Sequence, residues 1–525
     1  MQKSKINRVE TGLFSGISNR LSYHQNTLEK YIQQPFSKEA FEKQMNLKKE
    51  NYSSQNRLDL YDAIKLQYSE IEISESVKSN IELLKSENTY TITTGHQLSI
   101  FTGPIYFIYK ILHVIKLTKE LKETYPESNF VPVFWLASED HDFEEIQSVT
   151  LFNKSLKWET EQKGPVGRFN FESFKDVIEE FKELFKLEDS EVKKLLEKYN
   201  GLTLGEATFS FVNELFKDFG LVQVDGDNVL LKKQFSSIMK SELETSFSFQ
   251  AVQETNNKLS KEEIKLQVHP REINLFYIEQ NFRERIQLKG LDFLIEGKGE
   301  FSKEELLKEL ESYPEKFSPN VILRPLYQET VLPNLCYLGG GGEMSYWLQL
   351  KGVFDAAKIV YPLIQVRNSL LFIDAGSEKK MSNLGLTYSE LFKSSNDLKK
   401  QFVLKNSSQE LDFFGLEKLV KDFDVQLKEL AKNMNLGLES YAEAEITRFS
   451  KQVEGIEQKM IKAEKSKHEQ SLNQIDQLKE KLFPGNGVQE RSLNFFQLCT
   501  DGQVYSHLFD IYNVIDPFEN DLIIY

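Results

Sequence analysis

The chain has 525 residues, of which 40% are hydrophobic and 12% aromatic, so it is too long for one compact core and apolar enough to fold into several modules. Its 65 Lys and Arg residues against 80 Asp and Glu residues give a formal net charge of −15. A field of that sign repels polyanions, so we expect no nucleic-acid partner.

Cysteine content and hydropathy restrict the compartment. Two cysteines, Cys336 and Cys499, cannot form a disulfide framework, and neither belongs to a C-x-x-C pair, so we expect a reducing compartment and no structural zinc. Residues 1–7 lead into no apolar signal segment, and no stretch approaches the roughly 18 apolar residues that span a bilayer. These patterns predict a soluble cytoplasmic protein without a membrane partner.

The clearest local pattern runs from residue 89 to residue 137. Residues 90–94 are rich in β-formers and stop at Gly95, which predicts a strand that enters a tight turn. The apolar spacing over 105–121 predicts a helix with Pro104 near its first turn, and the apolar run 130–136 predicts a strand buried on both faces. Strand, helix and strand form a βαβ unit, and hence a parallel sheet.

A second block of this kind starts near residue 321. We expect a strand that ends at Arg324, a strand at 333–338, a helix at 343–357 and a strand at 359–364. Residues 220–225 form a shorter candidate strand. The charged stretches between these blocks are interpreted as insertions into one discontinuous α/β core.

From Leu416 to Leu482 the pattern changes. Apolar residues are separated by threes and fours, and charged residues fill the gaps. This spacing predicts a long helical hairpin or coiled coil that ends at residues 484–485. We expect it to join two chains into a homodimer rather than to take part in catalysis.

The first group of candidate site residues follows residue 94. Gly95 and His96 end a predicted strand, and parallel sheets bind ligands beyond the carboxyl ends of their strands. Glycine lets the backbone approach a phosphate, and an imidazole can stabilise charge that builds on it. With Gln97 and Gly103, these residues are candidates for nucleotide or substrate binding. A structural turn whose histidine caps the helix is an equally good interpretation.

The second group, Glu139, Asp140 and His141, follows the buried strand directly. Polar groups there are costly for folding unless solvent or a ligand satisfies them. Such side chains could hold Mg²⁺ with ATP, bind an amine or act as a general base, so we assign them, with His96, as catalytic candidates. The alternative is an acidic first turn that complements a helix dipole.

The third group is a glycine run that opens a helix. The N–H groups of Gly339, Gly340, Gly341 and Gly342, followed by Glu343, could cradle a nucleotide or another anion. The run lacks the Lys-Ser/Thr of the Walker pattern. Trp347 could stack on a base or pack in the core, and Arg324 could clamp a phosphate or a carboxylate.

Taken together, these motifs resemble the bacillithiol synthase family, the cysteine ligases assigned to the last step of bacillithiol biosynthesis. The matching strings, which extend from about residue 93 to residue 491, are TTGHQLSIFTGPIYFIYKI, VPVFWLASEDHDFEEI, GPVGRF, VILRPLYQETVLPNLCYLGGGGEMSYWLQLK and LFPGNGVQER.

The resemblance implies a fold similar to class I aminoacyl-tRNA synthetases, with a Rossmann-like core, two inserted connecting-peptide domains and an α-helical coiled coil that pairs two subunits. On this chain we expect the following parts: core at 1–152, 216–232 and 301–395, insertions at 153–215 and 233–300, coiled coil at 396–490, and a C-terminal segment at 491–525.

The reaction that the resemblance implies joins the carboxyl of cysteine to the amine of glucosaminyl malate, with ATP or ADP bound and Mg²⁺ as its candidate companion. Relatives carry Gln where this chain has His96, which makes His141 the stronger catalytic candidate. Related enzymes select cysteine through a thiolate-bound zinc, for which this chain lacks cysteines. A second nucleotide pocket attributed to the family has no assigned residues here.

Two other classes stay open. A nucleotide-binding dimeric scaffold without catalysis would explain the coiled coil and the glycines, but not the polar residues at 139–141. An aminoacyl-tRNA-synthetase-like enzyme with another amine acceptor would explain the fold, but the net charge of −15 opposes tRNA binding.

Overall fold

The computed structural model describes residues 3–407, 413–434 and 438–525. The chain forms two compact units, which are described separately. The larger unit comprises Met1–Val9, Leu13–Leu371 and Glu490–Tyr525, and the smaller unit comprises Glu10–Gly12 and Phe372–Gln489.

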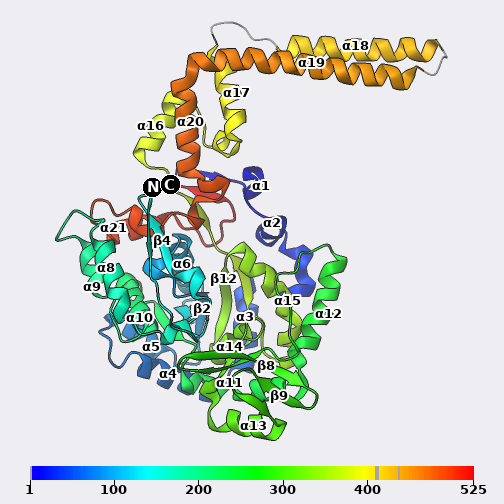
Figure 1. Cartoon of the computed structure of the whole chain (residues 1–525). Helices are drawn as coiled ribbons and strands as arrows, with labels where there is room; N and C mark the ends of the chain where they lie inside the picture. Colours follow the sequence, from blue (N-terminus) through cyan, green and yellow to red (C-terminus); the bar gives the residue numbers. More distant parts are fainter. Residues whose placement is uncertain (1–2, 408–412, 435–437) are drawn as a thin grey trace. The chain divides into compact units, whose positions relative to one another are not determined.

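The larger unit is built on a five-stranded parallel sheet (Figure 1). Its strands, in spatial order, are β13 (Leu363–Val366), β12 (Asn334–Gly339), β2 (Thr89–His96), β3 (Asn129–Leu136) and β6 (Val222–Asp225). The chain therefore adds strands on one side of β2 and later on the other side, so the strand order reverses between β2 and β12. This is the doubly wound arrangement of Rossmann-like folds.

The predicted βαβ unit is confirmed. Helix α6 (Tyr106–Thr124) packs against β2 and β3, which pair in register from Thr89 opposite Asn129 to His96 opposite Leu136. Nearly every residue of both strands is buried, as the apolar run in β3 predicts. The core beneath the sheet includes Ile92, Val114, Leu117, Leu335 and Leu363.

Two local predictions are wrong. Arg324 does not end a strand but begins helix α14 (Arg324–Val331), where Pro325 occupies the first turn and its missing N–H costs no hydrogen bond. The strand predicted at 359–364 begins only at Leu363, because Pro362 cannot donate to the ladder.

Along the chain, further helices and strands are inserted between the strands of the parallel sheet. Between β3 and β6 the chain forms β4 (Ser148–Leu151), β5 (Lys154–Lys157), α8 (Lys175–Lys182), α9 (Glu191–Glu197) and α10 (Leu204–Phe216). Between β6 and β12 it forms α11 (Val229–Thr245), α12 (Phe247–Lys261), β7 (Leu275–Glu279), β8 (Phe282–Lys289), β9 (Asp292–Ile295), β10 (Gly299–Phe301), α13 (Lys303–Ser312) and β11 (Phe317–Pro319). The strands β7 to β11 form an antiparallel sheet of their own.

The C-terminal segment returns to the larger unit. Strand β15 (Leu522–Ile524) pairs with β1 (Ser4–Ile6) and with β14 (Ser369–Leu371), and helix α21 (Tyr505–Val514) packs against α6. Residues after 490 therefore belong to the same compact body as the parallel sheet.

The smaller unit is helical. Its long helices α18 (Phe413–Asn433) and α19 (Glu439–Lys465) lie side by side (Figure 1), and the rings of Phe423 and Phe449 are 5.6 Å apart. Helices α16 (Ala375–Leu384), α17 (Ser395–Asn406) and α20 (Glu469–Leu482) pack around Leu398 and Ile475. The predicted helical hairpin is confirmed, although residues 408–412 and 435–437 of the predicted coiled coil lie outside the described residues.

Across the described ranges, each helix is either too short or too polar to cross a bilayer.

Candidate functional site at the carboxyl edge of the sheet

The structure brings the three predicted groups to one edge of the parallel sheet. Gly95 and His96 end β2, Glu139 follows β3, and Gly340 follows β12. Because these strands are parallel and adjacent, their carboxyl ends lie together at the edge where such sheets bind ligands.

A lysine that the sequence analysis missed joins two of these groups. Lys110 in α6 donates from Nζ to the carbonyl oxygen of Gly95 at 2.6 Å and to Oε2 of Glu343 at 2.9 Å. Glu343 lies in the first turn of α15 (Gly341–Ala357) and also accepts from the Tyr337 hydroxyl and from the Gly340 N–H. The Lys110 side chain is only 5% exposed. The network therefore bridges β2 and β12 where the strand order reverses.

The buried charges of this network stabilise each other. Burial opposes ionisation of Glu343, but Lys110 and the Tyr337 hydroxyl outweigh it and hold the pKa of Glu343 below its usual value. Burial also lowers the pKa of Lys110, against the attraction of Glu343. The Lys110–Glu343 pair is thus an ion pair in a largely water-free place.

His96 is held as a neutral ring. Its Nδ1 lies 2.9 Å from the Gln97 carbonyl oxygen, which can only accept, so Nδ1 carries the proton and Nε2 accepts from the Tyr106 hydroxyl at 3.3 Å. Burial, with Lys110 nearby, lowers the pKa of His96 to about 4. The imidazole is therefore uncharged at neutral pH.

Gln97 and Gly103 have distinct tasks in the loop after β2. The Gln97 side-chain amide donates to Asp140 at 2.8 Å and to Glu145 at 2.9 Å, which ties this loop to the loop after β3. Gly103 has a φ of 59°, and a Cβ there would lie 2.8 Å from Cβ of Ser99. Only glycine fits this turn without strain.

The three residues 139–141 occupy different environments. Glu139 is buried and forms an ion pair with Lys232 of α11, whose side chain is 0% exposed. Asp140 accepts from Gln97 and from the backbone N–H of His141 at 2.7 Å. Burial raises the pKa of Asp140, but its contacts with the His141 side chain and with Gln97, together with the charge of Arg283 and the His141 N–H, hold it well below its usual value. Asp140 is therefore ionised at neutral pH.

His141 is the most accessible of the three, with 52% of its side chain exposed. Its Nδ1 is hydrogen-bonded to the guanidinium of Arg283, which lies on β8 and packs 3.7 Å from the ring centre of Phe276. A guanidinium can only donate, so Nδ1 of His141 accepts. The neutral ring then carries its proton on Nε2, which gives His141 an N–H donor beside the sheet edge.

Two further carboxylates lie at the end of β6, Asp225 as its last residue and Asp227 just after it. Asp225 accepts from the Ser138 hydroxyl and from the Asp227 N–H, and Asp227 forms a two-pronged ion pair with Arg168 at 2.7 and 2.8 Å. Burial, with Asp227 nearby, raises the pKa of Asp225 to about 6. The β3–β6 part of the edge is therefore rich in carboxylates, two of which are paired with Lys232 and Arg168, whereas Lys110 lies at the β2–β12 part.

The glycine run divides into packed and open positions. A Cβ on Gly339 would lie 2.5 Å from Cε of Met344, and one on Gly341 would lie 2.4 Å from Oγ of Ser18. Gly340 and Gly342 have no heavy atom within 4 Å of that position. Two of the glycines are thus needed for packing, and the other two border open space.

Trp347 and Arg324 both contact Tyr337 of β12. Trp347 is fully buried and stacks on Tyr337 with the ring centres 4.5 Å apart, which favours the interpretation that it packs in the core. Arg324 lies over the Tyr337 ring and donates to Gln328 at 3.1 Å. It supports the strand β12 from the side of α14.

The acidic residues do not form a ready metal site. Within the described residues no group of three or more His, Cys, Asp or Glu side chains is arranged to hold a metal ion. Glu139 and Asp227 are already paired with Lys232 and Arg168. A Mg²⁺ ion would fit here only with most of its ligands supplied by phosphate oxygens and water, as is usual for nucleotide complexes.

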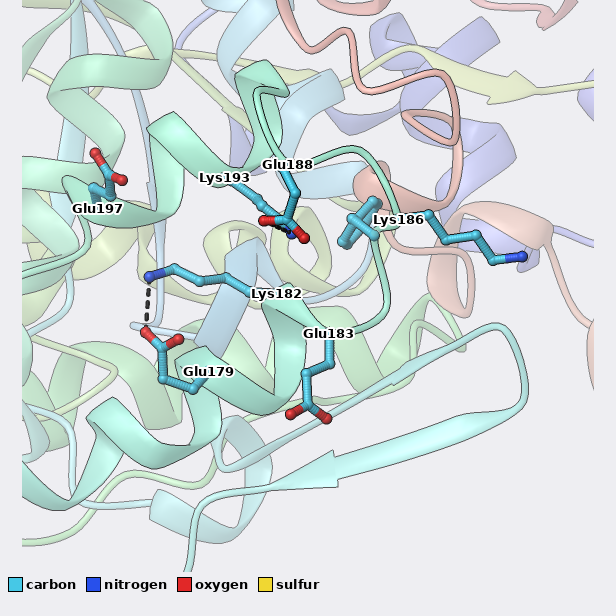
Figure 2. Close-up of a pocket in the computed structure, with 8 residues that line it drawn as sticks. Glu179, Lys182, Glu183, Lys186, Glu188, Lys193 and Glu197 are labelled. Carbon is cyan, nitrogen blue, oxygen red and sulfur yellow. Dashed lines mark hydrogen bonds and ion pairs between the residues drawn. The ribbon is translucent and has the colours of Figure 1, made fainter.

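A charged depression is lined by residues of α8, of α9 and of the segment between them (Figure 2). Its lining consists of Glu179, Lys182, Glu183, Phe185, Lys186, Glu188, Lys193 and Glu197. Its charges pair with each other, Lys182 with Glu179 at 2.8 Å and Lys193 with Glu188 at 2.9 Å. None of the predicted site residues lines it, so we do not assign it a function.

Comparison with known proteins shows the family. The model of the Bacillithiol biosynthesis BshC, N-terminal Rossmann-like domain matches residues 1–368, and that of the C-terminal coiled-coil domain matches residues 370–523. The chain is 45% identical over 468 residues to a Flavobacterium johnsoniae protein named "Putative cysteine ligase BshC", with 87% of each chain covered. A Flavobacterium psychrophilum protein of the same name is 42% identical over 474 residues, with 88% of each covered.

Among solved structures, one described as "putative arginyl t-RNA synthetase" from Campylobacter jejuni matches over 83% of this chain and 97% of its own at 10% identity, but its TM-score of 0.21 is too low to carry an argument. The predicted Rossmann-like core and coiled coil are confirmed by the family models and the sheet topology. The chain belongs to the BshC family of bacillithiol biosynthesis proteins.

Proposed function

We propose that this chain is a ligase that joins the carboxyl of cysteine to the amine of glucosaminyl malate, as the last step of bacillithiol biosynthesis. Membership of the family and the name shared by its relatives support this reaction. The structural observation that carries the proposal is the sheet edge itself. There the strand order reverses beside Lys110 and the open glycines, and an acidic cluster follows β3 and β6.

Amide formation in water is uphill, so the carboxyl must first be activated. In the proposed scheme a carboxylate oxygen of cysteine attacks a phosphorus of ATP and expels pyrophosphate or ADP, and the amine then displaces the phosphate-containing group from the acyl carbon. Gly340 and Gly342 have no heavy atom within 4 Å of their Cβ positions at the start of α15, so a phosphate could approach the backbone of this helix N-terminus. Lys110 holds the end of β2 and the first turn of α15 together through its hydrogen bonds to Gly95 and Glu343.

The acidic part of the edge fits the amine. Asp140 is ionised at neutral pH and would attract an incoming ammonium group, while Asp225, whose pKa is raised to about 6, could take up its proton. His141 presents Nε2–H, which would donate to an oxygen that gains negative charge during acyl transfer. Mg²⁺ would accompany the nucleotide phosphates rather than occupy an all-protein site.

We also propose a homodimer formed through α18 and α19. These helices expose large apolar side chains that a solvated hairpin would not need, among them Leu419 at 65%, Leu430 at 58% and Ile456 at 55%. Residues of this kind at three- and four-residue spacing suit a second copy of the same surface. The reaction would take place in the cytoplasm, where the two buried thiols stay reduced.

The test is direct. Purified protein, ATP, Mg²⁺, cysteine and glucosaminyl malate should yield bacillithiol, detected by mass spectrometry after thiol labelling, together with AMP or ADP. A cell in which the gene is deleted should lose bacillithiol and accumulate glucosaminyl malate, and the intact gene should restore the thiol. Binding of ATP without any turnover would instead support the scaffold, and retention of tRNA on a filter would support a synthetase-like enzyme.

A further inference from the structure

The loop between β2 and α6 has an unusual backbone. Phe101 and Thr102 have φ values of 49° and 67°, and Gly103 continues with 59°. Left-handed φ angles are rare for residues other than glycine, and a β-branched residue such as Thr102 is an outlier there. Both side chains are buried, and Thr102 Oγ1 has no hydrogen-bond partner, so no side-chain hydrogen bond of Thr102 offsets the cost of this backbone conformation. Something else must hold the loop in place.

The C-terminal segment does so. The side-chain amide of Asn494 donates to the carbonyl oxygens of Phe101 at 2.9 Å and of Gly103 at 2.6 Å, on either side of Thr102. Its own oxygen accepts from the Phe496 N–H at 2.9 Å, so the orientation of the amide is fixed. Asn494 is 1% exposed. The preceding residue, Leu493, accepts at its carbonyl from the Ile105 N–H at 2.6 Å.

The residues just before Asn494 also contact the candidate site, through Glu490 and Arg367. Glu490 forms an ion pair with Arg367 at 2.7 Å, and the guanidinium of Arg367 packs 5.0 Å from the ring centre of Tyr106. Tyr106 in turn contacts His96 at the base of the loop. Residues 490–494 thus hold the loop after β2 at its tip through Asn494 and at its base through Arg367.

We propose that Asn494 is a positioning residue of the candidate site: its amide holds the left-handed loop 101–103 in place, and so fixes His96 and Gln97 before the loop and Tyr106 after it. The proposal rests on the proposed function for its kinetic consequence. It assigns a task at the Rossmann-like core to a residue far beyond the match of the N-terminal family model, which ends at residue 368.

The test compares Asn494→Ala and Asn494→Asp with the wild-type protein. Asn494→Asp keeps the shape and the acceptor for Phe496 but places an oxygen against two carbonyl oxygens. Displacement of positioned groups is costly, so we expect kcat for ligation to fall about tenfold or more in both variants, with a smaller change in KM for cysteine. Hydrogen exchange of the amides at 99–106 should accelerate, while circular dichroism stays unchanged.

Rescue separates positioning from general stability. Thr102→Gly makes the left-handed φ easy and removes no hydrogen bond, so it should restore much of the kcat and of the exchange protection lost in Asn494→Ala. The matched control is Asn153→Gly, which relieves a φ of 66° in the turn between β4 and β5 and should restore neither. If Asn494→Ala does not fold, Asn494→Ser, which keeps one donor, takes its place.

Three results would overturn the proposal: unchanged kcat in both variants, unchanged exchange at 99–106, or equal rescue by Asn153→Gly. If the wild-type protein itself formed no product, the proposed function would fail. The exchange and rescue measurements would still decide whether Asn494 holds the loop.

Discussion

Lys110 donates to Glu343 at 2.9 Å across the place where the strand order of the parallel sheet reverses. The pair connects the helix after β2 with the helix after β12, two elements that the chain builds 233 residues apart. Because Lys110 also donates to the Gly95 carbonyl, the ammonium fixes the ends of both central strands together. The sheet edge is therefore organised before any ligand arrives.

Replacing Lys110 by Met should destabilise the protein. The change leaves the Glu343 carboxylate, 20% exposed, without its cation, and breaking a buried pair in this way costs about 3 kcal/mol. Urea unfolding followed by fluorescence would measure the loss. Lys182→Met is the control, because its pair with Glu179 is on the surface and should contribute less than about 1 kcal/mol. Adding Glu343→Gln to Lys110→Met should recover part of the stability, and equal losses in the two lysine variants would contradict the argument.

The sequence predicts the positions of the site loops better than the interactions within them. Each of the three loops follows a run of β-formers or apolar residues whose pattern predicts a buried strand, and parallel strands bring their carboxyl ends together. The glycine run at 339–342 could also be placed at this edge from the sequence, because it follows such a strand. Its division into packed and open positions could not be predicted, because Ser18, which crowds Gly341, comes from a distant helix.

The residues that the sequence analysis missed share one property. Their partners are far away along the chain: Lys110 is paired with Glu343, Arg283 reaches His141 from an inserted sheet, and Asn494 reaches Phe101 across 393 positions. Lys110 gives a weak signal, a single charge within the apolar face of a helix. For Asn494 no local pattern exists, since its task depends on a left-handed backbone that tertiary contacts impose.

Asp225 should make stability depend on pH. Its pKa in the folded protein is about 6, above the value of about 3.9 for an unfolded aspartate, so its favourable contribution is complete below about pH 4 and is lost as pH rises through about 6. Asp225→Asn keeps the acceptor for Ser138 and Asp227 and removes the charge. We expect the variant to be more stable than wild type by about 2 to 3 kcal/mol at pH 8 and equal to it below about pH 4. A pH-independent difference in denaturation would refute this assignment.

The dimer prediction concerns the hairpin of α18 and α19. Leu430 is 58% exposed and Leu427 is half-buried, and both belong to the three–four apolar spacing. Replacing both by Lys should give monomers in light scattering, because two buried charges oppose an apolar seam. Glu429→Lys, at an exposed position between them, should stay dimeric. A wild-type monomer at micromolar concentration would remove the basis for the prediction.

Metal content is the next prediction. Cys336 lies in β12 and Cys499 in the C-terminal segment, and burial raises the pKa of both thiols, which disfavours the thiolate that zinc requires. Elemental analysis of protein purified without chelator should therefore find well under one zinc per chain. Stoichiometric zinc would point to a site built from His and carboxylate side chains.

The two histidines at the sheet edge should differ in importance. His96 is buried, neutral at pH 7 and engaged at both nitrogens by Gln97 and Tyr106, so its ring supports the loop rather than reaching a ligand. His141 is half-exposed and, with Arg283 at Nδ1, has Nε2–H free to donate. Losing a group that stabilises developing charge typically costs about 10²-fold or more in rate.

We therefore expect His141→Ala to abolish thiol production in a complementation assay, while the protein stays folded and dimeric. His96→Gln, which supplies an amide of similar reach, should retain most activity. Arg283→Met should fall between them, because it leaves His141 in place but releases its ring from the fixed orientation. The reverse ranking of the two histidine variants would move the chemistry to Gly95, His96 and Gln97. Full activity in both histidine variants would show that this part of the edge is not the catalytic site. The glycine run at 339–342 would then become the better candidate for that site.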